Sequence, residues 1–308
     1  AAALLFASSS LQASTVTSLM YPETRREQTV DTLFGDVVAD PYRWLENDVR
    51  QDAEVAAWVE RQNLTTRSYL DTLPQRDWFA QRIRSLLDFE RFGLPTKAGS
   101  RYFYTRNAGL QNQSQLFVRS GLNGQPRLLL DPNTWASDAA TALDDWKPSD
   151  DGRYLLYSVQ DGGSDWRTLK VLDVRTGAVM SDEIRWAKFT QLAWVGNEGF
   201  LYSRFPEPQE GQAFQARNYN QAIYFHRIGT PQAADELVYA TPDHPEYGHS
   251  AEVTSDGRYA VVTSSIGTDA RYEVHVIDLK QRKRQGWKPR PLVSGFENDW
   301  RLVDGLGS

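Results

Sequence analysis

The chain contains no cysteine, which excludes disulfide bridges and metal sites with thiolate ligands. It also lacks several enzyme signatures: there is no G-x-S-x-G, no P-loop, no H-E-x-x-H and no G-x-G-x-x-G. The nearest approach is Gly162–Trp166, which has tryptophan in place of the second glycine and leads into a predicted strand. We assign its serine, Ser164, to a turn. The residues by themselves therefore predict neither a catalytic group nor a metal or organic cofactor.

An excess of basic residues is also missing. Lysine and arginine total 34 against 40 aspartates and glutamates, the formal net charge is −6, and the two signs are interspersed. This balance argues against nucleic acid or an anionic membrane as the main partner.

The apolar run at the start of the chain, residues 1–7, is too short to span a bilayer. Small and polar residues follow it up to Ala13, a pattern typical of the end of a secretory signal peptide. We therefore expect residues 1–20 to be the remnant of a leader, and the protein to be periplasmic or secreted. The alternative is a disordered tail rich in alanine and serine, which leaves a cytoplasmic location open.

Aromatic residues are abundant, at 12% of the 308 residues with ten tryptophans, and they accompany a repeat. The sequence S-D-D-G-R-Y-L-L-Y-S at 149–158 recurs as S-D-G-R-Y-A-V-V at 255–262. With two looser copies, the first aromatic residues of the units are spaced by 52, 46 and 59 residues. In each unit, turn residues precede a run of β-formers. A strand-rich unit that recurs about every 50 residues is typical of a propeller blade.

We therefore predict a mainly β fold, a partial β-propeller over residues 89–308, with four antiparallel strands per blade and about four blades present. No helix is expected after residue 90. A fifth blade is expected to open near Phe296, so the chain is interpreted as a fragment of a longer one. In the second unit the strands are predicted at 143–147, 153–160, 167–174 and 178–184. Third strands elsewhere are predicted at 115–119, 222–227 and 273–278, and fourth strands at 127–130, 236–239 and 291–293.

The region before the repeats, residues 21–88, has helical rather than strand periodicity. A short helix capped by Asp40 is predicted first, and then a helix that starts at Asp52 and ends before Pro74. A second amphipathic pattern follows around Trp78. The apolar faces of these helices need a packing partner.

The four histidines offer little catalytic potential. His226 and His275 are predicted in third strands, with no nucleophile nearby in the sequence, and we expect structural roles for them. His244 and His249 are predicted in a loop between blades, without metal-ligand spacing.

Five short motifs, in order, make the chain similar to the prolyl oligopeptidase (prolyl endopeptidase) family of serine peptidases. Residues 40–46 read D-P-Y-R-W-L-E, close to a signature near the start of that family. The resemblance covers about residues 21–300. The remaining motifs are G-L-Q-N-Q at 109–113, G-S-D-W-R-T-L-K at 163–170, K-F-T-Q-L-A-W at 188–194 and the blade opening S-D-G-R-Y at 255–259.

The resemblance implies a two-domain enzyme that hydrolyses short peptides on the carboxyl side of proline through a Ser-Asp-His acyl-enzyme mechanism, without a cofactor. An α/β-hydrolase domain would combine the N-terminal helices with a C-terminal part of the chain, and a propeller of seven blades would gate access. The triad is expected beyond Ser308, so no catalytic residue is assigned here. The implied partners are proline-containing oligopeptides and the missing peptidase domain. Nucleic acid and membrane are not implied, and a monomer is expected.

The resemblance also implies one substrate-binding residue, Phe189, in the apolar pocket for the residue two before proline. The alternative for an aromatic residue on a blade's first strand is a core position. Where animal enzymes have Met, Cys and Arg around the same cavity, this chain has Gly248, Thr268 and Ser265, which leaves the side-chain preference beyond proline open. A different class of function also remains open: a non-catalytic propeller that binds a protein or a glycan.

Overall fold

The computed structural model describes residues 19–137, 140–214, 216–300 and 302–305, so the predicted leader lies almost entirely outside the described residues. The chain divides into two compact units, Ala1–Ile83 with Gly211–Gln215, and Arg84–Glu210 with Ala216–Ser308. Within the described ranges, no helix combines the length and the apolar character needed to cross a bilayer.

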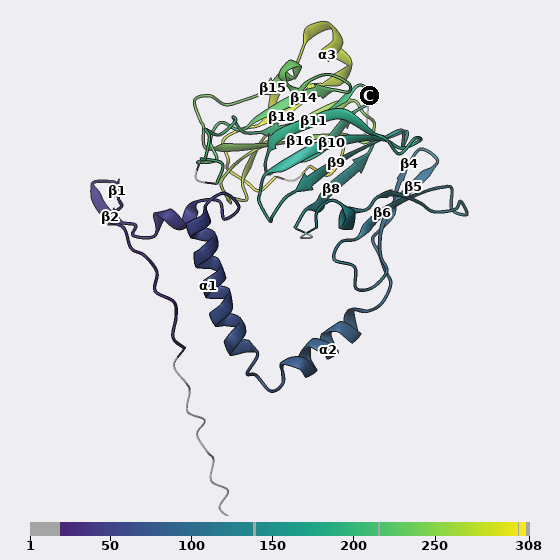
Figure 1. Cartoon of the computed structure of the whole chain (residues 1–308). Helices are drawn as coiled ribbons and strands as arrows, with labels where there is room; N and C mark the ends of the chain where they lie inside the picture. The colour runs from purple at the N-terminus through teal and green to yellow at the C-terminus, as the bar shows by residue number, and fades with distance from the viewer. Residues whose placement is uncertain (1–18, 138–139, 215, 301, 306–308) are drawn as a thin grey trace, which may run out of the picture. The chain divides into compact units, whose positions relative to one another are not determined.

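The first unit contains a β-hairpin, a 3₁₀ turn and the long helix α1 (Figure 1). Helix α2 follows α1 and spans the division between the units. The elements are β1 (Val30–Leu33), β2 (Asp36–Ala39), η1 (Arg43–Glu46), α1 (Ala53–Leu70) and α2 (Arg76–Leu87).

Two predicted helix starts have different outcomes. Asp52 caps α1 as expected, because its carboxylate accepts hydrogen bonds from the backbone N–H of Glu54 at 2.8 Å and Val55 at 3.2 Å. Asp40 does not cap the first helix, which begins only at Arg43 and has no side-chain cap. The Asp40 carboxylate instead pairs with the Arg43 guanidinium.

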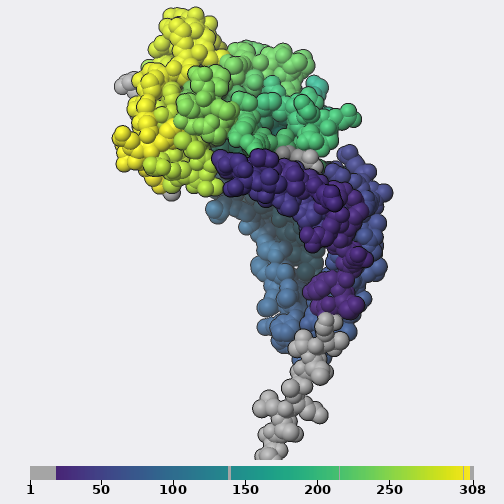
Figure 2. Space-filling view, turned by 90° about the vertical axis from the view of Figure 1, so that its left-hand side faces the viewer, coloured from purple at the N-terminus to yellow at the C-terminus, as the bar shows by residue number. Residues whose placement is uncertain are grey.

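The second unit is built from antiparallel sheets in chain order, which confirms the predicted blades. In Figure 2 its surface passes from teal through green to yellow, so that successive chain segments lie next to one another. The sheets of blades 2 and 3 are connected by one pair of strand residues, Ala187 in β11 and Arg204 in β13. Blade 1 contains β3 (Arg91–Phe92), β4 (Thr96–Ala98), β5 (Arg101–Asn107), β6 (Gln115–Ser120) and β7 (Arg127–Leu130). Blade 2 contains β8 (Ala142–Pro148), β9 (Tyr154–Gln160), β10 (Arg167–Asp173) and β11 (Val179–Ala187). Blade 3 contains β12 (Ala193–Val195), β13 (Gly199–Arg204), β14 (Ala222–Arg227) and β15 (Glu236–Tyr239). Blade 4 contains β16 (Tyr247–Val253), β17 (Tyr259–Ile266), β18 (Tyr272–Asp278) and β19 (Arg290–Val293).

The repeated turn explains why the two best copies look alike. The Ser149 hydroxyl donates to Asp151 at 2.8 Å and accepts from the backbone N–H of Tyr154 at 3.0 Å. In blade 4, Thr254 makes the same two bonds, to Asp256 at 2.7 Å and from Tyr259 at 3.0 Å. The counterpart of Ser149 is therefore Thr254, one residue before the repeat that the sequence shows.

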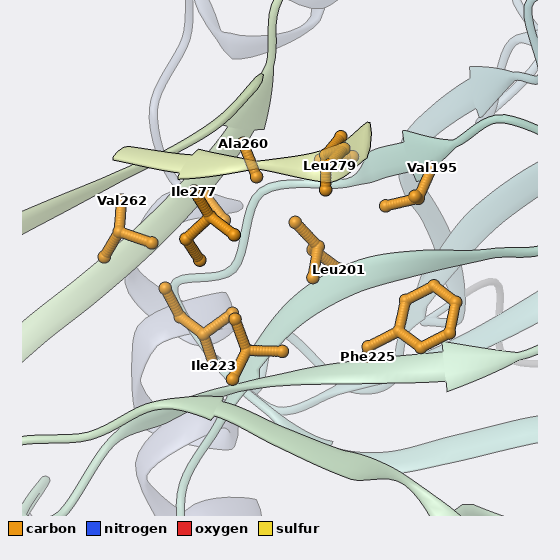
Figure 3. Packing of buried hydrophobic residues seen from close by; sticks show 11 residues of the cluster. Val195, Leu201, Ile223, Phe225, Ala260, Val262, Ile277 and Leu279 are labelled. Carbon is orange, nitrogen blue, oxygen red and sulfur yellow. The ribbon is translucent and has the colours of Figure 1, made fainter. Parts of the chain in front are cut away.

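The blades pack through alternate residues of their second strands. In β9, Leu155 belongs to the cluster shared with blade 1, and Leu156 belongs to the cluster shared with blade 3. Figure 3 shows the next interface, where residues of blade 3 and blade 4 point toward one another. Because neighbouring residues of a strand point to opposite faces, each second strand contributes to two cores. The buried residues of the cluster in Figure 3 are Ala193, Val195, Leu201, Ile223, Phe225, Val238, Ala251, Ala260, Val262, Ile277 and Leu279.

The expectation of no helix after residue 90 is wrong. Helix α3 (Leu279–Gln285) lies between β18 and β19. Asp278 caps it by accepting from the backbone N–H of Lys280 at 2.9 Å, and Leu279 is buried in the cluster between blades 3 and 4. All of its exposed residues are polar, so the sequence has no apolar period that would predict it.

Two glycines at the same position of the repeat provide a matched pair for a test. Gly152 and Gly257 have left-handed φ angles of +69° and +67°. A Cβ on Gly152 would lie 2.7 Å from the carbonyl oxygen of Ala98 in blade 1, whereas a Cβ on Gly257 would meet nothing within 4 Å. Gly257→Ala should therefore lose only the left-handed strain, about 1–2 kcal/mol. Gly152→Ala should lose about 1–3 kcal/mol more through the forced contact between blades. Equal losses in thermal unfolding would show that this contact adjusts without strain.

Candidate substrate cavity

The second unit contains a cavity of about 750 Å³ lined by residues from blades 3 and 4, from the connection between blades 2 and 3 and from the segment after β19. Its wall is partly aromatic and partly polar. Small residues on the first two strands of blade 4 leave space for it, because Gly248 pairs with Ser265 and Ser250 pairs with Thr263 across β16 and β17. The aromatic lining residues are Phe189, Phe205, Tyr247, Tyr272 and Trp300.

The structure brings together the four positions that the resemblance singles out. Phe189, Gly248, Ser265 and Thr268 all line this cavity. The expected position of Phe189 on the first strand of a blade is wrong. Phe189 lies in the connection between β11 and β12. Its side chain is 61% exposed, which contradicts the alternative of a core position. Its role in substrate binding stays a prediction.

The predicted loop position of His249 is wrong. His249 lies in β16 and is only 2% exposed. Its Nδ1 lies 2.9 Å from the Ser264 hydroxyl and its Nε2 lies 3.0 Å from the Thr241 hydroxyl. Burial, together with His275 nearby, lowers the pKa of His249 to about 4, so the ring is neutral at pH 7.

The His249–Ser264 pair is not a nucleophile with its base. Ser264 has no exposed surface, so its hydroxyl cannot reach a substrate in the cavity. Both hydrogen-bonding positions of the imidazole are occupied by hydroxyls, with no carboxylate to orient the ring. The pair therefore serves to satisfy buried polar groups beneath the cavity wall.

Among the described lining residues the charged side chains are Glu246 and Glu252, and none is a lysine or arginine. Lys188 places a cation beside the aromatic wall, because its ammonium lies 5.4 Å from the centre of the Phe189 ring and 4.9 Å from that of Trp166. Aromatic faces with a few polar groups suit a peptide that brings apolar side chains and backbone amides.

The structure contains a second buried polar cluster, formed by His226, Asp182 and Asp235, which the sequence did not predict. His226 in β14 has no exposed side-chain surface, and it lies between Asp182, 2.9 Å from Nε2, and Asp235, 2.7 Å from Nδ1. Burial opposes its charge, but the hydrogen bonds to both carboxylates outweigh this and raise the pKa of His226 to about 9. Burial opposes the charge of Asp182, but its hydrogen bonds with His226 and with the backbone N–H of Gly229 hold its pKa below the usual range.

The His226 group links blades 2 and 3. Asp182 belongs to β11, and it also accepts from the backbone N–H of Gly229 at 2.6 Å, while Tyr202 donates to Asp235 at 2.6 Å. These contacts support the structural role expected for His226. The sequence offers no signal for the group, because Asp182 and His226 are 44 residues apart.

Comparisons with known proteins agree with this architecture. A family model described as the N-terminal β-propeller domain of prolyl oligopeptidase matches residues 21–308. The chain is 34% identical to a prolyl endopeptidase from Elizabethkingia miricola and 35% identical to one from Elizabethkingia meningoseptica. These matches cover 97% and 98% of this chain but only 41% and 42% of the relatives, so the chain spans about two fifths of their length.

Solved structures give the same result. One structure from a study of two prolyl endopeptidases is 50% identical, with a TM-score of 0.65 over 93% of this chain and 41% of that chain. Prolyl oligopeptidase B from Galerina marginata, bound to a 35mer hydrolysis and macrocyclization substrate, is 27% identical, with a TM-score of 0.76 over 94% of this chain and 43% of that chain. With the matched blades, the chain belongs to the prolyl oligopeptidase family and carries its N-terminal β-propeller domain.

Proposed function

We propose that the full-length protein is a prolyl endopeptidase that hydrolyses short peptides on the carboxyl side of proline. The observation that supports this most directly is the cavity, where Phe189 stands exposed beside Gly248, Ser265 and Thr268 in a propeller of this family. In this proposal the cavity receives the side chain two residues before proline, and the propeller admits oligopeptides while excluding folded proteins.

The bond-breaking groups are proposed to lie in a part of the protein beyond Ser308. The structure supports this in two ways. The Ser–His pair of the cavity wall is inaccessible, and the family model that matches the chain is that of the propeller alone. A C-terminal α/β-hydrolase domain with a Ser-Asp-His triad would form the acyl-enzyme without a cofactor.

The N-terminal helices are proposed to belong to that peptidase domain. Helix α2 has no buried residue, and its apolar side chains Trp78, Phe79 and Ile83 are all more than half exposed. An apolar helix face of this kind needs a partner to be stable. The missing domain would provide it, within a monomer that is periplasmic or secreted.

The test compares two proteins. The full-length chain should release the chromophore from a blocked proline peptide, and a serine-directed inhibitor should abolish this activity. The 308-residue chain alone should be inactive, because the Ser264–His249 pair in its described part is buried. Failure of the full-length protein to cleave after proline would contradict the proposal and favour a binding propeller. Inhibitor-sensitive cleavage by the shorter chain would reveal a nucleophile within it.

A further inference from the structure

Phe189 has an unusual backbone. Its φ angle is +53°, in the left-handed region that bulky residues rarely occupy, and the residue is 61% exposed. The ring therefore gains little from burial that would hold the backbone in this conformation. Residues in such conformations persist only where surrounding contacts enforce them, and they gather at ligand sites.

The carbonyl before Phe189 is held by a buried glutamine. Gln221, which immediately precedes β14 and is 3% exposed, donates from its side-chain nitrogen to the carbonyl oxygen of Lys188 at 2.9 Å. Its side-chain oxygen accepts from the backbone N–H of His249 at 2.6 Å. One amide therefore joins the connection after blade 2 to the first strand of blade 4.

The residue after Phe189 is held by a second buried residue, Ser203. The hydroxyl of Thr190 accepts from the backbone N–H of Ser203 at 2.7 Å. The hydroxyl of Ser203, which has no exposed surface, donates to the backbone carbonyl of His249 at 2.6 Å. Both neighbours of Phe189 are thus tied to the backbone of His249, one through Gln221 and one through Ser203.

The backbone just before Gln221 is itself held by a hydrogen bond. The preceding residue, Asn220, is also left-handed, with a φ angle of +61°, and its backbone N–H donates to the carbonyl oxygen of Pro245 at 2.7 Å. Gln221 lines the cavity together with Phe189. Gln221 therefore follows one left-handed residue, Asn220, and its amide binds the carbonyl just before another, Phe189.

We propose that Gln221 is a positioning residue that holds the Phe189 ring in the wall of the cavity, and that it thereby sets the preference for a bulky side chain two residues before proline. The inference rests on the proposed function. Gln221 acts through the backbone of Lys188, and the preference depends on its two hydrogen bonds rather than on its contact with a substrate.

The test uses Gln221→Met, which keeps the length of the side chain but removes both hydrogen bonds, and Gln221→Glu, which keeps the acceptor for His249 but loses the donor to Lys188. Gln232 provides the matched control. Its amide also bridges backbone groups, accepting from the N–H of Arg185 and donating to its carbonyl, both at 3.0 Å, but it does not line the cavity.

The measured quantity is the ratio of kcat/KM for a peptide with a bulky apolar residue two before proline to that for the glycine peptide. In the full-length enzyme we expect Gln221→Met to lower this ratio about tenfold, the size of a small change in an apolar pocket, mainly through KM. Gln221→Glu should fall between it and the native protein, and Gln232→Met should leave the ratio within about twofold. An unchanged ratio in Gln221→Met, or an equal loss in Gln232→Met, would overturn the inference.

A second measurement does not depend on hydrolysis. With 4-fluorophenylalanine at position 189, the native protein should give one ¹⁹F resonance that shifts or broadens in the Gln221→Met background and not in Gln232→Met. An unaltered resonance in Gln221→Met would overturn the inference even if the protein proved not to cleave after proline. Absence of proline-specific cleavage in the native protein, by contrast, contradicts only the proposed function.

Discussion

Replacing His226 with leucine should destabilise the propeller by about 3–5 kcal/mol, the loss expected when one partner of a buried ion pair is removed. The imidazole lies between Asp182 and Asp235 with no exposed side-chain surface. Without it, two carboxylates stay buried at the junction of blades 2 and 3, with no cation to offset them. Urea or thermal unfolding of the full-length protein and of the variant measures the difference.

The control for this variant is His275→Leu. His275 also lies in a third strand, but burial lowers its pKa, so its ring is not held as a cation. We expect it to lose about 0.5–3 kcal/mol, as most substitutions do. Adding Asp182→Asn and Asp235→Asn to His226→Leu should restore part of the stability, because the unpaired charges disappear. Equal losses for the two histidines would show that the charge of His226 contributes nothing.

The pH dependence follows from the same group. Folding raises the pKa of His226 from its ordinary value of 6.5 to about 9. Its stabilising contribution is therefore complete below about pH 6.5 and is lost as the pH rises through about 9. The lowered pKa of Asp182 acts at the other end, where stability is lost as the pH falls below the usual range of a carboxyl group. The variant His226→Leu should lack the alkaline decline that the native protein shows between these values.

Replacing Phe189 with alanine should lower kcat/KM by roughly 10–200-fold for peptides with a bulky apolar residue two before proline, or about 1–3 kcal/mol of transition-state binding. Apolar surface removed from water contributes about 25 cal/mol per Å². Stacking on a substrate side chain adds roughly 0.5–1.5 kcal/mol. Peptides with glycine at that position should respond far less, because they bring no side chain to the ring.

The melting temperature separates binding from folding in this experiment. Because 61% of the Phe189 side chain is exposed, its removal opens no core cavity, and the fold should keep its stability. Phe34→Ala is the matched control, since Phe34 is another exposed phenylalanine with a left-handed φ angle, +54°, in the hairpin of the first unit. It should leave both peptides unaffected. Equal losses for the two peptides together with a lowered melting temperature would remove Phe189 from the site.

Local sequence patterns predict the strands of the blades well, because turn residues mark where each strand begins. The expected bounds of β7, β14 and β15 are those of the structure, since strong β-formers stand between turn residues there. Helix α3 could not be predicted in this way. Its stability comes from the Asp278 cap, from Leu279 in the core and from Arg282, which pairs with Glu198 at 2.7 Å.

The sequence likewise predicts one part of the candidate site and not the rest. Phe189 could be named from a motif, but its left-handed backbone and its place off the strands could not, because both depend on Gln221 and Ser203 in blade 3. The burial of His249 likewise depends on Ser264, which meets it only once β16 pairs with β17, and on Thr241 in the connection before β16. Contacts between segments that are distant in the chain produce no periodic pattern in the sequence, so they cannot be predicted from it.

The alternation of Leu155 and Leu156 between two cores has a consequence for how such a chain tolerates insertions. Adding or deleting one residue within a second strand would exchange its faces, and so would disturb both neighbouring interfaces at once. Length can vary freely only in the connections. The longest of the three steps between units, 59 residues, contains the connection between β13 and β14, which contributes Phe205, Asn218 and Gln221 to the lining of the cavity.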